Sequence, residues 1–123
     1  MRTTIVLPAI AAITACAVPV ERNDDILAQA LAGRTAGAAQ RCVSTTPSQN
    51  IRVIDSRHVA YENGRTLWVN TLLANCPSLD PHNLVIVERG GSEICRGDRV
   101  RAAEPGAIIA GPTCNLQDWV PYR

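Results

Sequence analysis

A turn-forming dipeptide near the middle of the chain, Asn63-Gly64, is the feature that most limits how this sequence can fold. It lies within residues 51–76, between two runs rich in β-branched and aromatic side chains. Asn and Gly readily take the positive φ angles that a type I′ turn needs, so this stretch predicts a β-hairpin. The turn also predicts a register, whose facing pairs are Glu62 with Arg65, Ala60 with Leu67, Val59 with Trp68 and His58 with Val69.

The rest of the chain offers few large side chains for a core. The 123 residues include two Trp, two Tyr and no Phe, so the core has to be built mainly from Val, Ile, Leu and Ala. A chain of this length has room for one domain, and so lean a core benefits from covalent cross-links. Twelve Arg, with no Lys, nearly balance eleven acidic residues, so no net field favours nucleic acid or an anionic membrane as a partner.

The N-terminus has the organisation of an export signal. Arg2 precedes an uncharged, mostly apolar run at residues 3–14, which ends in the small residues Ala15-Cys16-Ala17. This run is shorter than the roughly 20 apolar residues of a membrane-spanning helix, and no later run approaches that length. We therefore expect no transmembrane helix in the mature protein.

The residues around Cys16 fit two ways of processing this signal. The stretch Ile13-Thr14-Ala15-Cys16 resembles a bacterial lipobox, where a peptidase cuts before a cysteine whose sulfur carries diacylglycerol. Lipidation of Cys16 is the favoured interpretation, with residues 1–15 as export signal, 16–22 as a tether and 23–123 as a single β-rich domain. Alternatively, Ala15 and Ala17 form an A-x-A site, and cutting after Ala17 releases a soluble protein.

Four further cysteines predict two disulfides. Once Cys16 is assigned to lipid or to the discarded signal, four cysteines remain: Cys42, Cys76, Cys95 and Cys114. In an oxidising compartment, such thiols form disulfides. Spacing allows three pairings, of which we favour Cys76 with Cys95, between neighbouring hairpins, and Cys42 with Cys114, between the two ends of the domain. The chain has no C-x-x-C and no closely paired His, so a zinc site is not expected. Redox-active or free thiols are the remaining alternative.

The remaining patterns predict one helix and several short strands. Asn23 or Asp24 caps the helix, Gly33 ends it, and an apolar stripe follows helical spacing at Ile26, Leu27, Ala30 and Leu31. Strands separated by Gly and Pro turns are expected at 42–44, 51–54, 58–62, 84–88, 92–95, 99–103 and within 114–122. The predicted fold class is mainly β (α+β): a small antiparallel sheet curled into a barrel or sandwich, with one short N-terminal helix and two disulfides.

The sequence assigns no catalytic, cofactor-binding or metal-binding residue. His58 and His82 are the only imidazoles, and we interpret His58 as an ordinary sheet-face histidine and His82 as a solvated one. Asp55 and Glu62 lie near several Arg residues, which favours charge pairing over the chemistry of paired carboxylates. No G-x-S-x-G elbow, phosphate-binding glycine loop or H-E-x-x-H is present. No cofactor is expected.

Short motifs spread over residues 33–122 carry a family resemblance. They are Gln40-Arg41-Cys42-Val43, Val53-Ile54-Asp55, residues 64–70, Cys76-Pro77-Ser78-Leu79, Cys95-Arg96-Gly97-Asp98, and Cys114-Asn115-Leu116 with Pro121-Tyr122. With their four-cysteine spacing they resemble a family of small exported proteobacterial lipoproteins of unknown function. Gln117 and Trp119 depart from it, standing where the family pattern Cys-x-Leu-Gly-x-Phe has Gly and Phe. The resemblance implies export and a shared architecture, and it assigns no catalytic residue.

These features together predict a non-enzymatic, lipid-anchored binding or structural module of the cell envelope. Its expected partners are the membrane, through lipid on Cys16, and another envelope protein or a cell-wall component, with no nucleic acid. Ala17 resembles the residue that follows the lipidated cysteine in Gram-negative lipoproteins sent to the outer membrane. One alternative is a soluble periplasmic or secreted enzyme or inhibitor, in which Asp55, His58 and an Arg converge in a cleft. Another is a redox module with an easily reduced disulfide.

Overall fold

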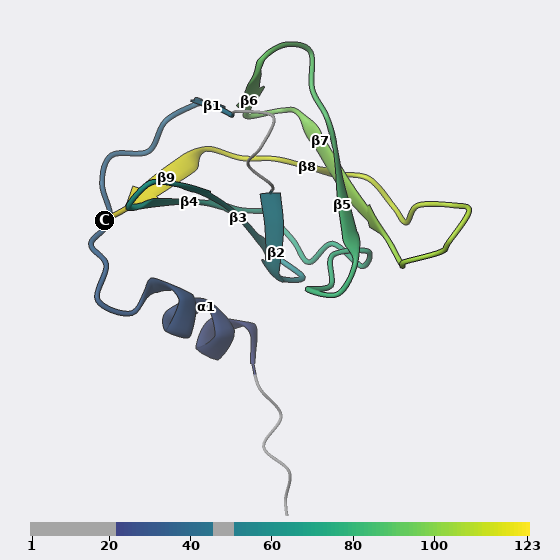
Figure 1. Cartoon of the computed structure of the whole chain (residues 1–123), viewed down its shortest axis with the longest axis horizontal. Helices are drawn as coiled ribbons and strands as arrows, with labels where there is room; N and C mark the ends of the chain where they lie inside the picture. The colour runs from purple at the N-terminus through teal and green to yellow at the C-terminus, as the bar shows by residue number, and fades with distance from the viewer. Residues whose placement is uncertain (1–21, 46–50) are drawn as a thin grey trace, which may run out of the picture.

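The computed structural model describes residues 22–45 and 51–123 of the chain (Figure 1). Its elements are α1 (Asn23–Leu31), β1 (Cys42–Ser44), β2 (Ile51–Asp55), β3 (His58–Asn63), β4 (Thr66–Thr71), β5 (Leu84–Glu88), β6 (Glu93–Cys95), β7 (Arg99–Ala103), β8 (Cys114–Asn115) and β9 (Trp119–Tyr122). The predicted export segment, Cys16 and the tether up to residue 21 lie outside the described residues. Within the described ranges no helix has the length and hydropathy of a membrane span.

The strands form three antiparallel sheets, in the orders β2-β3-β4-β9, β5-β7-β8 and β1-β6. The main core joins them, since Tyr61 of β3 and Trp119 of β9 belong to one buried cluster with Val100 of β7 and Ile94 of β6. The sheets pack as layers and do not close into a barrel (Figure 1). The predicted mainly β class with one helix and two disulfides is confirmed, in its sandwich form.

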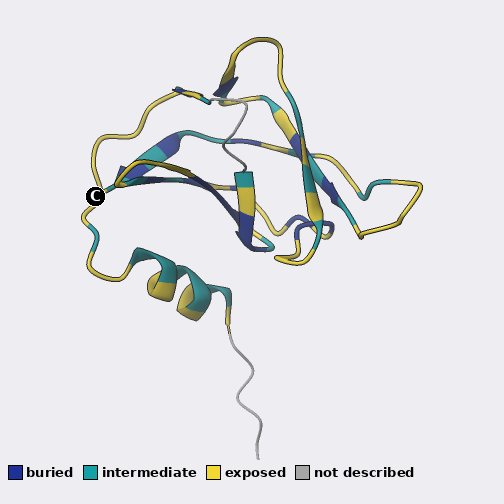
Figure 2. Ribbon diagram, viewed as in Figure 1, coloured by how far each residue is buried: buried dark blue, intermediate teal, exposed yellow. Residues whose placement is uncertain are grey.

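Helix α1 covers the other face of the four-stranded sheet (Figures 1 and 2). The predicted stripe of Ile26, Leu27, Ala30 and Leu31 packs there against a second buried cluster, made of Ile54, Ala60, Leu67 and Val69. The predicted N-cap is wrong, because Arg22 occupies that position and makes no side-chain cap. The side chain of Asn23 instead donates a hydrogen bond to Ser56 Oγ at 2.8 Å, which ties the start of the helix to the β2–β3 turn.

The β3–β4 hairpin is confirmed, but its predicted register is wrong by two residues. Its turn is Gly64-Arg65, so Asn63 faces Thr66 and His58 faces Thr71. Gly64 has a φ of +59°, and no described residue other than glycine has a positive φ. Positive φ at the first turn residue alone is the pattern of a type II′ turn, which moves the loop one residue along the chain. A shift of two keeps every side chain on its predicted face.

Both predicted disulfide pairings are wrong, because the bonds join Cys42 to Cys95 and Cys76 to Cys114. The prediction of Cys76 with Cys95 assumed that consecutive hairpins lie side by side. Strand β6 pairs instead with β1, 49 or more residues earlier in the chain, which puts Cys42 directly opposite Cys95. Cys76, in the connection between β4 and β5, is then left beside Cys114 at the start of β8.

Candidate functional site

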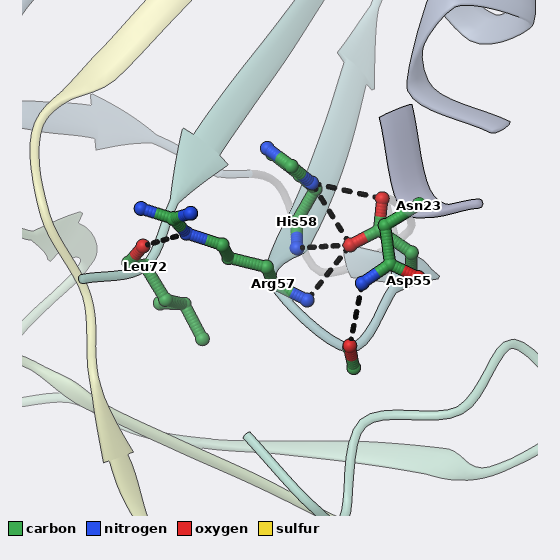
Figure 3. A network of polar contacts seen from close by, with 6 residues as sticks. Asn23, Asp55, Arg57, His58 and Leu72 are labelled. Carbon is green, nitrogen blue, oxygen red and sulfur yellow. Dashed lines mark hydrogen bonds and ion pairs between the residues drawn. The ribbon is translucent and has the colours of Figure 1, made fainter. Parts of the chain in front are cut away.

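The turn between β2 and β3 brings Asp55 and His58 into contact. A β-bulge between Val53 and Asp55 shifts the register there. The Asp55 carboxylate accepts hydrogen bonds from the backbone N–H groups of Arg57 and His58, at 2.7 and 2.9 Å. His58 Nδ1 lies 2.8 Å from both carboxylate oxygens (Figure 3). Both side chains are buried. A carboxylate held by two backbone N–H groups fixes the orientation of the imidazole.

The side chain of Arg57 is directed away from this pair, toward the end of β4. Its Nε donates to the carbonyl oxygen of Leu72 at 2.8 Å, and only its backbone contacts Asp55 (Figure 3). The predicted sign of an enzyme, an Arg converging with Asp55 and His58, is therefore absent from the described residues. Within them, no Ser, Thr or Cys side chain bonds to the His58 ring either.

The other titratable residues considered in the sequence lie apart from this pair. Glu62, near the opposite end of β3, forms an ion pair with Arg34 at 3.4 Å instead of facing Arg65. His82 is exposed as predicted, and its Nδ1 contacts Asp80 Oδ1 at 2.9 Å. The His82 backbone N–H, and then its ring, hold the pKa of the Asp80 carboxyl below its ordinary value of 3.8. Asp55 and Glu62 thus have separate partners, His58 and Arg34, instead of the Arg residues that are near them in the sequence.

The outer surface of the β5-β7-β8 sheet is the least expected feature of the molecule. Val85 and Val87 of β5 pack against the main core, so Leu84 and Ile86 point outward and are 61% and 37% exposed. The register places Leu84 opposite Ala103, on this same outer surface. A run of apolar residues predicts a strand that is buried on both sides. Because polar residues do not alternate with apolar ones here, the sequence pattern does not reveal that one side is open to solvent.

The loop at residues 104–113 extends this apolar surface. Ile108 and Ile109 are 100% and 84% exposed, and the loop protrudes from the end of β7 (Figure 2). Ile109 and Ala103 line a common hollow of about 230 Å³. We call Leu84, Ile86, Ala103, Ile108 and Ile109 the apolar face. It holds four of the five large apolar side chains that are exposed among the described residues.

Charged side chains border the apolar face on one side. In the register of β5 with β7, Ile86 lies opposite Arg101, and Glu88 lies opposite Arg99. Glu88 forms ion pairs with both Arg side chains, at 2.8 Å to Arg99 and 3.2 Å to Arg101. We call these three residues the charged rim. One sheet surface therefore changes from apolar to charged along its strands, as protein interfaces do from core to rim.

Neither histidine belongs to a cluster of metal-binding side chains in the part of the chain that the structure describes. The group found there comprises Cys42, Glu93 and Cys95, whose ligand atoms lie within 4.8 Å of one another. Its two sulfurs form a disulfide, so they are not thiolate ligands in this state. Sequence reasoning missed this group because it depends on the pairing of β1 with β6.

No family model, curated protein or solved structure matches this chain. The family resemblance carried by the four-cysteine motifs therefore stays a prediction.

Proposed function

We propose that this chain is a lipid-anchored, non-enzymatic module of the cell envelope that binds another envelope protein through the apolar face. The lipobox at Cys16 supports the anchor, and the two disulfides suit an oxidising compartment outside the cytoplasm. Ala17 supports a place at the periplasmic side of the outer membrane.

The observation that carries this proposal is the exposure of the apolar face beside the charged rim. Soluble monomers rarely leave large contiguous apolar patches open to water, and a patch rimmed by polar groups is typical of a protein-binding surface. Complete burial of an Ile side chain stabilises a complex by roughly 1.5–3 kcal/mol, so Ile108 and Ile109 supply most of the affinity. Glu88, Arg99 and Arg101 then favour a partner with complementary charges.

Photocrosslinking in the native host tests this surface. A photoreactive residue placed at Ile86 or Ile109 should give a discrete adduct with one envelope protein, and the same residue at exposed Gln29 of α1 should not. Ile108→Asp should reduce the Ile86 adduct by about tenfold or more, because a buried charge replaces buried apolar area. Arg65→Ala, on the distant hairpin turn, is the matched control and should leave it unchanged. Equal adducts from all positions would overturn the proposal.

The intact mass of the protein from its host tests the anchor separately. We expect a chain beginning at Cys16 with added acyl mass, and four thiols that appear only after reduction. A chain beginning at Val18 would show cutting after Ala17 and would make the protein a soluble one.

A second candidate function, a soluble periplasmic enzyme or inhibitor, is favoured by the Asp55–His58 pair. The ring contacts of His58 within the described residues run through Nδ1, which leaves Nε2 to accept a proton. Turnover of an ester, peptide or glycoside substrate by the purified protein, abolished in a folded His58→Gln variant, would favour the enzyme. Unchanged turnover in that variant would exclude His58 as its base.

A further inference from the structure

The Cys42–Cys95 disulfide lies in a much more accessible setting than Cys76–Cys114. It joins directly opposite residues of β1 and β6, which are three residues long and form a sheet of their own. Both of its cysteines are partly exposed, whereas in the other bond Cys114 is partly exposed and Cys76 is fully buried in the main core. Thiol–disulfide exchange requires a thiolate to reach a sulfur atom, so the Cys42–Cys95 bond, with two partly exposed cysteines against one, is the more open to a reductant.

A carboxylate is already placed beside these two sulfurs. Glu93 precedes Cys95 by two positions in β6 and so shares its side of the strand. Its carboxylate and both Sγ atoms lie within 4.8 Å of one another. Ser44, opposite Glu93 in the register, donates a hydrogen bond from Oγ to Glu93 Oε1 at 3.1 Å. The carboxylate is therefore oriented by a neighbour, as ligands in metal sites usually are.

Space for an ion and its water lies next to this group. A hollow of about 270 Å³ is lined by Cys42, Ser44 and Glu93, together with Gln40, Val43, Asn63 and Trp68. A second hollow of about 290 Å³ is also lined by Glu93 and Cys95. The disulfide and the carboxylate are thus reachable from solvent.

We propose that reduction of Cys42–Cys95 by a dithiol converts this group into a Zn²⁺ site, with Cys42, Cys95 and Glu93 as ligands and water in the fourth position. One thiolate of the dithiol attacks a sulfur of the pair, forming a mixed disulfide and releasing the other sulfur as a thiolate. The second thiolate of the dithiol then resolves the mixed disulfide. The dithiol loses two electrons and becomes a disulfide, the chain gains two thiols, and Zn²⁺ displaces their two protons on binding.

The donor set selects the metal. Two thiolates and a carboxylate form a tetrahedral zinc set, and Zn–S bonds of about 2.3 Å place two sulfurs roughly 3.8 Å apart. Side-chain rotation of two facing cysteines reaches that separation once the bond between them is open. Hard ions such as Mg²⁺ and Ca²⁺ favour oxygen donors and would not bind here. The redox state of one bond thereby controls metal binding.

Graded reduction of the full chain tests the site. Mapping of alkylated cysteines should show Cys42–Cys95 open at dithiothreitol concentrations that leave Cys76–Cys114 closed. After the reductant is removed, this form should bind one Zn²⁺ per chain, and the oxidised chain none. Co²⁺ in place of Zn²⁺ should give the charge-transfer absorption of thiolate ligands. Opening of Cys76–Cys114 first, or zinc binding by the oxidised chain, would overturn the proposal.

Surface variants separate this site from adventitious binding without risk to the fold. Glu93→Gln should weaken zinc binding by at least tenfold and Ser44→Ala by about tenfold, at unchanged selectivity of reduction. Glu104→Gln removes an exposed carboxylate outside the β1-β6 sheet and should leave the affinity as it is. Equal zinc affinity in the Glu93 and Glu104 variants would rule out Glu93 as a ligand. Zinc binding by a reduced Cys42→Ser, Cys95→Ser double variant would place the metal elsewhere.

Discussion

At the scale of single residues, the chain holds two Asp–His pairs of the same chemistry in opposite surroundings. Asp55 and His58 are buried at the turn between β2 and β3, while the side chain of His82 is 92% exposed beside Asp80. Each carboxylate also accepts a backbone N–H from its histidine, at 2.9 and 2.8 Å respectively. The two pairs therefore differ mainly in how much water surrounds them, and this difference decides their energetic weight.

Replacing the two carboxylates by amides should give very different losses of stability. Asp55→Asn removes the charge that faces His58 and turns an N–H₂ group toward buried donors, so we expect a loss of about 3 kcal/mol in the free energy of unfolding. Asp80→Asn at pH 7 should leave it nearly unchanged, because that pair is surrounded by water. Urea unfolding followed through the buried Trp119 measures both. Equal losses would show that the buried pair is not structural.

The pH dependence at Asp80 has a definite sign. The pKa of this carboxyl is below its ordinary value of 3.8 because the backbone N–H of His82 donates to it. A carboxyl whose pKa is lower in the folded chain stabilises the fold at pH values above 3.8. This contribution is lost as the pH falls through the pKa of the folded protein. The small difference between Asp80→Asn and the parent chain should therefore vanish in strong acid.

Sequence patterns predicted where these residues lie along the strands better than they predicted which residues surround them. His58 was predicted to lie on a sheet face, and it does, but its contact with Asp55 depends on the bulge between Val53 and Asp55. A bulge adds one residue to one strand, and the sequence indicated a kink or bulge only slightly later, at Asp55-Ser56. The exposure of Ile108 was equally hidden, because a short apolar segment normally predicts burial.

At the scale of elements, local signals located the strands well, and tertiary pairing set their details. Strands β1, β5 and β7 have the predicted bounds, because turns and loops containing Gly or Pro separate them along the chain. The hairpin turn differs because Gly64 alone adopts a positive φ among its residues. Each side chain still lies on its predicted side of the sheet, because a register shift of two residues preserves the alternation of side chains between the two sides. Which side of a strand is buried can thus be predicted more reliably than which residues face each other across two strands.

Helix α1 should contribute to stability through its apolar stripe and little through its own helical tendency. The helix has nine residues, which is too short to persist alone in water. Leu27 packs on the cluster of Ile54, Ala60, Leu67 and Val69 while staying partly exposed, so Leu27→Ala should lower the free energy of unfolding by about 1–2 kcal/mol. Gln29→Ala, on the exposed side, should change it by less than about 0.5 kcal/mol. Thermal unfolding of both variants compares them, and a neutral Leu27→Ala would mean that α1 is not part of the folded unit.

At the scale of the whole molecule, the long-range connections escaped prediction. Four cysteines allow three pairings, and spacing does not choose among them. The choice follows from β6 pairing with β1 in place of its sequence neighbours, a contact between segments about 50 residues apart. The apolar face has the same origin, because it exists only where β5, β7 and the loop at 104–113 meet.

The two disulfides should stabilise this arrangement unequally. Loop entropy alone assigns each about 4 kcal/mol, since they span 53 and 38 residues. Removing Cys76–Cys114 also takes sulfur out of the main core, so a Cys76→Ala, Cys114→Ala variant should lose more, about 5–6 kcal/mol, which approaches the whole stability of a small domain. A Cys42→Ala, Cys95→Ala variant should lose about 4 kcal/mol or less and keep its sheets. Denaturant unfolding without reductant compares the two variants.

This difference bears directly on the proposed zinc site. Opening Cys42–Cys95 is useful as a switch only if the β2-β3-β4-β9 and β5-β7-β8 sheets stay folded around the Cys76–Cys114 bond, in which Cys76 is buried. A larger loss for the Cys42 and Cys95 variant than for the other would contradict both the stability ranking and the idea that this bond opens in a folded chain. The expected order instead leaves one bond that maintains the fold and one that is free to exchange, because only the second has both of its cysteines partly exposed.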